Sequence, residues 1–249
     1  MKHLLTVILL SVSLMAPAQE RTYLLGVGRT SLLDTYLSPE HYAGTELRLV
    51  QTREKPLKKA PMWIRTTASQ EFVSVTEPRS KDASELAGMY EFSYGMSRRF
   101  DLNDSFSIAV GGQADAFVGG IYNTRNGNNP AQLKLGFDIA PAFRATYRFR
   151  LLHKDFRLDY RGRLPLMGLQ FSPAYGQSYY EIFSEGDYDH NVCFASPTNA
   201  LSYSNMLTLG VRIRRTFLTI GYLGDFRQAE FNSLKHHSFT HSFVIGYTL

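Results

Sequence analysis

The sequence predicts an all-β protein, namely a transmembrane, antiparallel, up-and-down β-barrel of ten strands. Three observations predict it: segments in which apolar and polar residues alternate with period two, the unusual length of those segments, and an N-terminal stretch typical of secreted proteins. Successive side chains of a strand point to opposite faces, so such segments are apolar on one face and polar on the other. Aromatic residues, which favour strands, are abundant, with 15 Tyr and 17 Phe.

The N-terminus has the features of a cleaved secretion signal. Residues 2–3 are basic, residues 4–14 are mostly apolar, and the small residues of Ala-Pro-Ala at 16–18 suit a cleavage site. We therefore expect a signal peptide over residues 1–18 and a single barrel domain over residues 19–249.

Composition limits the partners. The formal net charge of +5 is small, and together with secretion it argues against nucleic acid as a partner. The lone cysteine, Cys193, rules out an intrachain disulfide framework and leaves its own role open. We expect no cofactor.

The clearest strand covers residues 133–150. Leu133, Phe137 and Phe143 fall on one face, while Lys134 and Arg144 fall on the other. Strands of soluble proteins usually have about five or six residues, whereas a tilted membrane strand needs about 9–11. The length of this segment therefore favours a membrane barrel over a secreted, ligand-binding β-barrel.

The remaining strands are expected from the same alternation. In chain order, the ten predicted strands cover residues 23–30, 45–49, 63–75, 90–97, 106–118, 133–150, 156–166, 201–214, 218–227 and 239–249. The first is required mainly because bacterial single-chain barrels have an even number of strands. Counts from eight to twelve strands are compatible with the pattern.

The connections divide into two sets. Those at residues 55–60, 101–104, 151–155 and 215–216 are short, and those at 31–42, 76–83, 122–131, 172–200 and 230–236 are long. Outer-membrane barrels have short periplasmic turns, long extracellular loops and both termini in the periplasm. The two sets therefore predict an address in the outer membrane of a Gram-negative bacterium.

Two segments carry a family resemblance. SLLDTYLSPEHYAGTELRL at residues 31–49 and YGQSYYEIF at residues 175–183 resemble an uncharacterised domain-of-unknown-function family of Gram-negative outer-membrane β-barrel proteins. The final alternation into Leu249 resembles the C-terminal insertion signal of such barrels, which most often ends in Phe. The resemblance implies a fold and an address. For a barrel at that address we expect outer-membrane lipid and the barrel assembly machinery as partners. It carries no catalytic residue.

Charged residues on the inward face are mostly arginines. The predicted lumenal charges are Arg144, Arg148, Arg157, Asp159, Arg161, Arg163, Arg212, Asp225 and Arg227, with Lys134 and Asp138 on the same face. They could line an anion-selective pore or fill the interior as Arg–Asp pairs. We favour a filled interior, since open aqueous channels are typical of about 16–18 strands.

Basic residues also gather at the predicted periplasmic ends. They are Arg53, Lys55, Lys58, Lys59, Arg98, Arg99, His153, Lys154, Arg214 and Arg215. We interpret them as contacts to anionic phospholipid headgroups of the inner leaflet.

One arrangement of residues resembles a catalytic motif. His236 and Ser238 superficially resemble the His-x-Ser pattern of lipid A deacylases, but Phe239 follows where that pattern has Asn. No acid can be placed beside them, although Glu230 lies across the same hairpin. We expect no catalytic residue.

The outer loop over residues 172–200 is the candidate for recognition. Its predicted recognition residues are Tyr175, Tyr179, Tyr180, Glu181, Phe183, Asp187 and Asp189. Asp187-x-Asp189-x-Asn191 has the opening spacing of a calcium loop, but Val192 and Thr198 occupy positions that need Gly and Glu, so we expect no metal site. The loop could bind an extracellular glycan or protein, or could fold into the barrel mouth as a lid.

These observations predict an integral outer-membrane β-barrel with a structural or recognition role executed through extracellular loops. An extracellular ligand is not specified. The alternatives are a narrow channel for small solutes or anions and an outer-membrane lipid-modifying enzyme.

Overall fold

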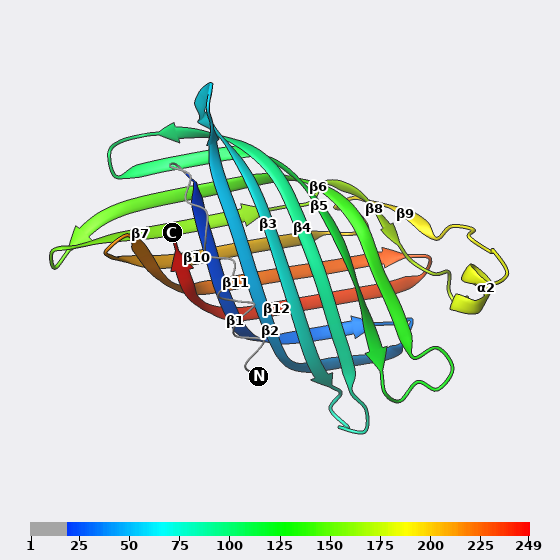
Figure 1. The fold of residues 1–249 in the computed structure, drawn as a ribbon. Coiled ribbons are helices and arrows are strands. Elements are labelled where there is room, and N and C mark those ends of the chain that lie inside the picture. Colours follow the sequence, from blue (N-terminus) through cyan, green and yellow to red (C-terminus); the bar gives the residue numbers. More distant parts are fainter. Residues whose placement is uncertain (1–18) are drawn as a thin grey trace.

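The computed structural model describes residues 19–249, so the expected signal peptide over residues 1–18 lies outside the described part. The described chain is almost entirely β-strand, with one short helix (Figure 1). The elements are β1 (Glu20–Asp34), β2 (Ser38–Leu57), β3 (Ala60–Glu77), β4 (Glu85–Asp101), β5 (Phe106–Asn123), β6 (Ala131–Leu151), β7 (Lys154–Arg163), β8 (Met167–Phe171), α2 (Tyr179–Phe183), β9 (Val192–Ala195), β10 (Ser202–Ile213), β11 (Thr216–Phe231) and β12 (Leu234–Thr248).

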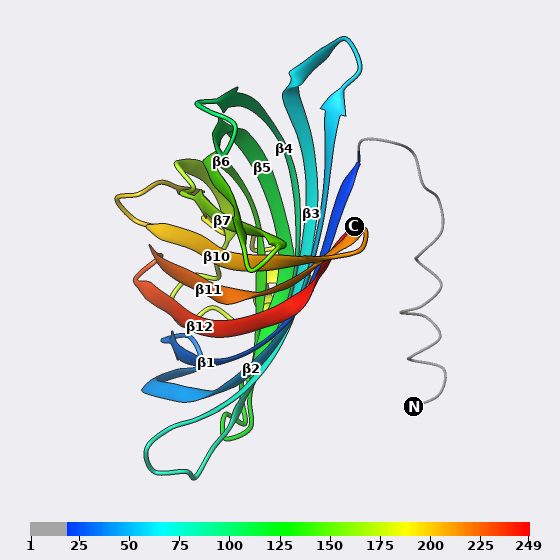
Figure 2. The same cartoon turned by 90° about the vertical axis from the view of Figure 1, so that its left-hand side faces the viewer.

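Ten of these strands close into an antiparallel barrel. Strands β1 to β7 and β10 to β12 each pair with two neighbours, and the barrel closes where β1 pairs with β12 (Figure 2). The remaining strands, β8 and β9, form a hairpin that joins the outer part of β6. The prediction of a ten-stranded, up-and-down, antiparallel barrel is confirmed.

The barrel is apolar outside and polar inside. Large apolar side chains remain exposed on the outer wall, for example Phe137 at 45% and Ile245 at 54%. The most buried side chains are often charged or polar, including Arg48 at 1% and Glu85 at 0%. A lipid-facing wall explains this distribution, because hydrocarbon replaces water outside and polar groups satisfy one another inside.

The predicted strands are present, and most are longer than expected. The strand predicted at residues 23–30 extends over β1, Glu20–Asp34. The strand predicted at residues 156–166 is interrupted: β7 ends at Arg163, and β8 begins at Met167 after Leu-Pro-Leu. Proline lacks the N–H that a central strand needs, which accounts for a break at Pro165.

Two outer connections are shorter than predicted. The expected loop over residues 31–42 is wrong, because β1 runs to Asp34 and only residues 35–37 form the turn. The expected loop over residues 230–236 is a hairpin turn at Asn232 and Ser233, whose φ angles are 52° and 62°. Positive φ at both central positions suits a two-residue β-hairpin. Strand pairing therefore continues outward where the sequence pattern suggested loop.

Both termini of the described chain lie at one end, with the turns at residues 58–59, 102–105, 152–153 and 214–215. In bacterial barrels this end faces the periplasm. The outer end carries the connections at residues 78–84, 124–130 and 172–200. Among residues 19–249, no helix is long and apolar enough to cross a membrane.

Candidate functional site

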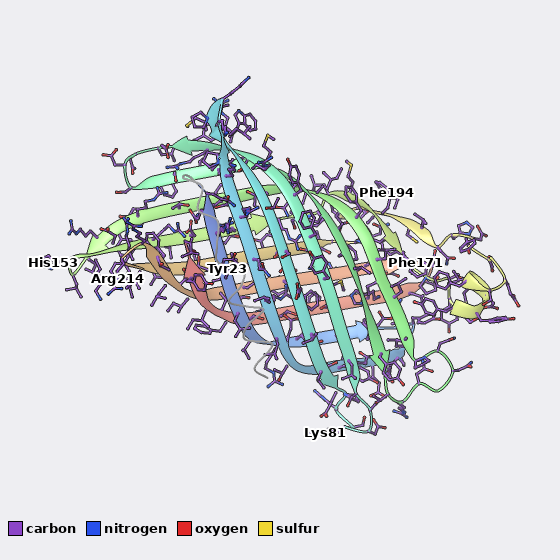
Figure 3. All side chains as sticks on the ribbon, viewed as in Figure 1. Tyr23, Lys81, His153, Phe171, Phe194 and Arg214 are labelled. Carbon is purple, nitrogen blue, oxygen red and sulfur yellow. The ribbon has the colours of Figure 1, made fainter. Side chains whose placement is uncertain are left out.

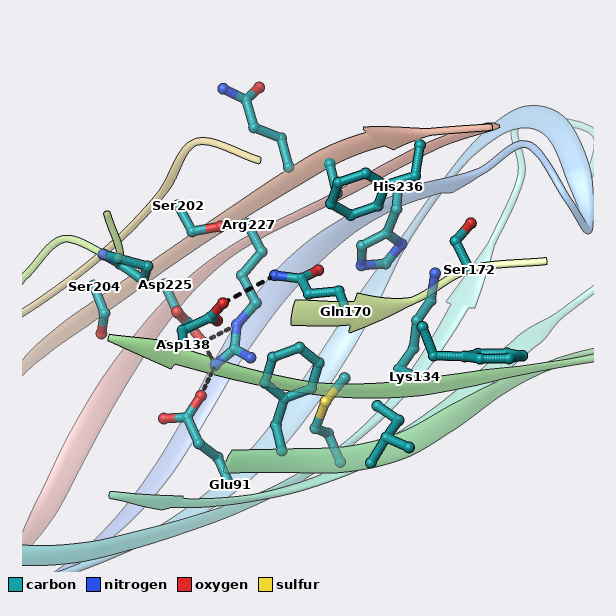
Figure 4. A pocket seen from close by; sticks show the side chains of 18 of the residues that line it. Glu91, Lys134, Asp138, Gln170, Ser172, Ser202, Ser204, Asp225, Arg227 and His236 are labelled. Atoms are coloured by element: carbon teal, nitrogen blue, oxygen red, sulfur yellow. Dashed lines mark hydrogen bonds and ion pairs between the residues drawn. The ribbon is translucent and has the colours of Figure 1, made fainter. Parts of the chain in front are cut away.

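A cavity of about 70 Å³ lies inside the outer half of the barrel (Figure 4). Its lining is mixed: Lys134, Asp138 and Arg227 contribute charge, while Phe117 and Phe171 contribute apolar surface. Alternation places these polar side chains inward from β6 and β11, and β8 adds Gln170, whose amide donates a hydrogen bond to Asp138 at 3.3 Å. The cavity is bounded by ion pairs that cross the lumen.

The outermost of these ion pairs joins Lys134 to Asp34. Lys134 Nζ lies 2.6 Å from an oxygen of Asp34, a carboxylate that is 1% exposed. Strands β1 and β6 are opposite in the barrel, with four strands between them in either direction, so this contact spans the bore. His236 Nδ1 contacts the same Asp34 oxygen at 3.1 Å. One buried carboxylate thus joins β1, β6 and β12.

A second layer of ion pairs crosses the middle of the barrel. Arg227 lies 2.8 Å from Glu91, and their strands, β11 and β4, are again opposite. Arg163 contacts Glu91 at 2.6 Å and Asp115 at 2.8 Å. Asp225 lies 3.0 Å from Arg227. The layer therefore ties β4, β5, β7 and β11 together across the lumen.

Strand β2 completes this middle layer. Arg48 lies 2.9 Å from Asp225 and 2.8 Å from Glu46, and all three side chains are at least 95% buried. Its guanidinium also stacks over Phe72, 4.2 Å from the ring centroid. Buried charges are stable only when paired and hydrogen-bonded, and this arrangement satisfies both conditions.

A third layer lies toward the periplasmic end. Arg144 pairs with Glu54, with Asp159 at 2.9 Å and with Glu20 at 3.4 Å. Arg161 reaches Glu54 at 3.0 Å. Arg157 contacts Asp159 at 2.7 Å and Glu20 at 3.0 Å. Arg144 to Glu20 and Arg161 to Glu54 join opposite strands, so the bore is crossed at this level too.

Two of the predicted lumenal charges lie outside these layers. Arg212 is at the periplasmic rim, 52% exposed, and its nearest acid, Asp155, is 3.8 Å away. Arg148 is exposed in the periplasmic mouth. The predicted lumenal charges did not include the carboxylates of Glu20, Glu54 and Glu91. These carboxylates lie on β1, β2 and β4 and pair with the predicted arginines. Glu91 lies on the polar face of a predicted strand, and that signal could have found it.

The connection between β7 and β10 is folded into an outer cap, which we define as residues 167–200. It contains the β8–β9 hairpin and α2 (Figure 1). Ser178 caps α2, and Glu181 returns the contact by accepting a hydrogen bond from the Ser178 N–H at 2.6 Å. These hydrogen bonds hold the pKa of Glu181 below its ordinary value. The Ser-x-x-Glu spacing is a capping-box signal that the prediction of an irregular loop missed.

The aromatic residues of the cap separate into two groups. Tyr179 faces the barrel: its hydroxyl accepts a hydrogen bond from the Leu133 N–H at 2.6 Å, and burial raises the pKa of Tyr179. Tyr175, Tyr180 and Phe183 remain 77%, 67% and 58% exposed. The lid and recognition hypotheses therefore apply to different side chains of the same segment.

Two side-chain amides stabilise the cap. Asn191, 2% exposed, donates hydrogen bonds to Ser172 O at 3.1 Å and Gln177 Oε1 at 2.7 Å. Asn232, in the β11–β12 turn, donates to Ser172 O, Pro173 O and His190 O at 3.0–3.3 Å. Asn191 thus holds the cap together from within, and Asn232 attaches it to the barrel rim.

The acidic residues of the cap do not form a cluster. Asp187 accepts a hydrogen bond from the Asp189 N–H at 3.4 Å, and Asp189 pairs with His190 at 2.8 Å on the exposed surface. Within residues 19–249, no group of three or more His, Cys, Asp or Glu side chains could hold a metal ion.

The structure corrects the expected surroundings of His236. An acid does lie beside it, and that acid is Asp34 from β1. Glu230, which the sequence placed across the hairpin, contacts Lys235 at 3.8 Å instead. The Asp34 contact depends on β1 closing the barrel against β12, a pairing between chain ends that local sequence does not reveal.

The fold and its inverted polarity define an outer-membrane β-barrel. The chain belongs to a family described as proteins of unknown function, DUF3316, which matches residues 13–248. No curated protein sequence matches the chain.

Solved structures with a similar fold are outer-membrane barrels. The outer-membrane protease OmpT of Escherichia coli is 8% identical, with a TM-score of 0.53, over 95% of this chain and 98% of that one. The transport unit of the autotransporter AIDA-I of Escherichia coli is 8% identical, with a TM-score of 0.46, over 97% and 96%. Ail of Yersinia pestis is 8% identical, with a TM-score of 0.33, over 93% and 99%. At this identity the likeness to OmpT concerns the fold alone.

Proposed function

We propose that this chain is an integral protein of the Gram-negative outer membrane that recognises an extracellular glycan through its outer cap. The observation that carries the proposal is the pairing of an anchored base with an exposed aromatic surface. Tyr179 and Asn232 hold the cap to the barrel, while Tyr175, Tyr180 and Phe183 remain exposed, Phe183 with one face stacked on Tyr179. Binding residues concentrate on such loops when a rigid scaffold positions them.

The chemistry of the exposed surface favours a glycan. Tyr180 and Tyr188, 67% and 63% exposed, offer an apolar ring face with a polar tip. Glu185, Asp187 and Asp189 supply nearby carboxylates, which accept hydrogen bonds from hydroxyl donors. A sugar ring presents both an apolar face and hydroxyl donors.

The interior supports recognition rather than conduction. Lys134–Asp34, Arg227–Glu91 and Arg161–Glu54 each join opposite strands, so ion pairs occupy the bore at three levels. Opening a path would separate buried charges, at a cost of about 3–5 kcal/mol for each uncompensated charge. A barrel closed in this way is suited to display and poorly suited to solute flow.

A glycan array tests the recognition hypothesis. We expect the purified barrel to bind a defined set of glycans, and Tyr180→Ala to weaken that binding about tenfold, the size of one aromatic contact. Phe100→Ala is the control, because Phe100 is an aromatic side chain, 39% exposed, at the opposite end. Absence of glycan binding, or equal losses in the two variants, would contradict the proposal. If the barrel bound an immobilised protein but no glycan, that result would also contradict the proposal.

Planar bilayer recording tests the closed interior. We expect the wild-type barrel to show no discrete conductance steps. Sustained steps would favour the rival hypothesis of a narrow channel.

A further inference from the structure

The periplasmic mouth of the barrel contains a cavity of about 400 Å³ with a strongly basic lining. Five arginines face it: Arg99, Arg144, Arg148, Arg157 and Arg215. The side-chain carboxylates in the lining are those of Glu20 and Glu54. The volume falls within the range of small-molecule sites, about 300–1,000 Å³. This cavity lies on the periplasmic side of the third ion-pair layer, at the opposite end of the barrel from the outer cap.

The side-chain carboxylates around the cavity are already engaged. Glu54 pairs with Arg144 and Arg161, and Glu20 pairs with Arg144 and Arg157. The next acids outward are likewise taken. Asp159 contacts Arg144 and Arg157, and Asp101 contacts Arg99 at 2.6 Å.

Arg148 and Arg215 are left over. Within residues 19–249, neither guanidinium has a carboxylate within the 4.0 Å ion-pair distance or a hydrogen bond to the protein. Arg148 is also the register partner of Arg157 on the neighbouring strand. Like charges directly opposite on adjacent strands destabilise a sheet. The sequence therefore retains Arg148 where a neutral residue would fold at lower electrostatic cost.

We infer that this mouth is a binding site for an anionic phosphate group. Guanidinium groups match phosphate oxygens with paired N–H donors, and such charge-assisted bonds are among the strongest in proteins. Arg148 and Arg215 supply free donors. Arg157, 9% exposed and stacked 4.7 Å from the centre of the Phe217 ring, supplies a rigid wall.

The site opens toward the periplasm, where such groups have two sources. One is the headgroup of an anionic phospholipid in the inner leaflet, approached over a rim that includes His153 and Arg214 (Figure 3). The other is a soluble phosphate compound. Both present the same chemistry to Arg148, so the experiment distinguishes them.

The test titrates inorganic pyrophosphate into the full barrel in nanodiscs of zwitterionic phosphatidylcholine, followed by calorimetry. We expect saturable binding at one site, weakened about tenfold or more by Arg148→Gln, because a charge-assisted hydrogen bond is lost. Arg150→Gln is the matched control, since Arg150 lies two residues further on the same strand, is 72% exposed and does not line the cavity. Its effect should stay within about twofold.

A second arm repeats the titration in nanodiscs that contain phosphatidylglycerol. Loss of pyrophosphate binding there identifies the lipid headgroup as the occupant, and unchanged binding identifies a soluble ligand. If Arg148→Gln does not insert, Arg215→Gln replaces it, because Arg215 follows the turn residue Arg214 and lines the same cavity. No saturable binding in phosphatidylcholine, or equal losses in Arg148→Gln and Arg150→Gln, would overturn the inference.

Discussion

The middle and the periplasmic mouth of the lumen use arginine in different ways. In the middle, Arg163 and Arg227 are 13% and 14% exposed and each contacts two carboxylates. In the mouth, Arg148 and Arg215 are exposed and have no acidic partner among the described residues. The difference follows from burial, because a charge removed from water must be paired, whereas a solvated charge remains available to a ligand.

The largest expected effect comes from removing the shared carboxylate of the middle layer. Glu91→Ala leaves Arg163 and Arg227 buried without their common partner, so we expect a loss of about 3–5 kcal/mol in the free energy of unfolding. Denaturant unfolding in detergent micelles measures it. Arg148→Gln in the mouth should change stability by no more than about 0.5 kcal/mol. Similar midpoints for the two variants would remove the contrast between middle and mouth.

The second prediction compares the two faces of the wall. Phe143→Arg places a charge on the lipid side and should cost about 2–4 kcal/mol. Gln113→Arg places the same side chain in the lumen, where Gln113 now donates to Asp115 at 2.6 Å, and should cost much less. The fraction that keeps heat-modifiable gel mobility reports insertion. Equal tolerance would show that the assigned faces are wrong.

A third prediction concerns the attachment of the cap. Asn232→Gly removes the amide that donates to three cap carbonyls, while glycine keeps the φ of 52°. We expect a local loss of about 1–3 kcal/mol. Burial raises the pKa of the nearby Cys193 thiol, and the Asn232 amide, which donates a hydrogen bond to that sulfur at 3.6 Å, opposes the rise. A loosened cap should expose the sulfur and speed maleimide labelling severalfold at neutral pH through easier access of the reagent. Ser233→Gly, at the other turn position, should leave labelling unchanged. Faster labelling in both variants would show that the effect comes from a change in the turn itself and not from loss of the Asn232 amide.

The smallest expected effect is at the cap of α2. Ser178→Ala should weaken the helix by about 1 kcal/mol, seen as faster amide exchange over Tyr179–Phe183. The pKa of Glu181 is lowered by its hydrogen bonds to Ser178, so the stability it adds is present above the ordinary value of 4.5 and is lost as pH falls through the lowered pKa. Ser184→Ala, beyond the helix, is the control. Exchange that does not respond to acid would argue against this role of Glu181.

The alternation of residues was sufficient to predict the strands and their faces. Leu133 to Arg150 shows why: one residue of register reverses every side chain, so a long apolar face specifies a single orientation. The same reasoning assigned Arg144 and Arg163 to the inward face. It overestimated the outer loops because polar residues such as those at 38–41 can belong to a strand that continues beyond the membrane.

The partners of those charges could not be predicted from the alternation of neighbouring residues. Arg144 meets Glu20, and the two residues are 124 positions apart in the chain. Which acid faces which arginine depends on strand order and on the relative shift of strands around the barrel, both of which arise only when β1 and β12 close. The cap is a partial exception, since its Ser-x-x-Glu signal was readable in advance.

The sequence by itself therefore determined the strands, the lipid-facing wall and the presence of an arginine-rich interior, because period-two alternation is a local property. The tertiary structure alone decided that Arg227 is neutralised across the bore while Arg148 is not. The physical reason is that pairing depends on distance through space and on depth below solvent, and both are set by barrel closure.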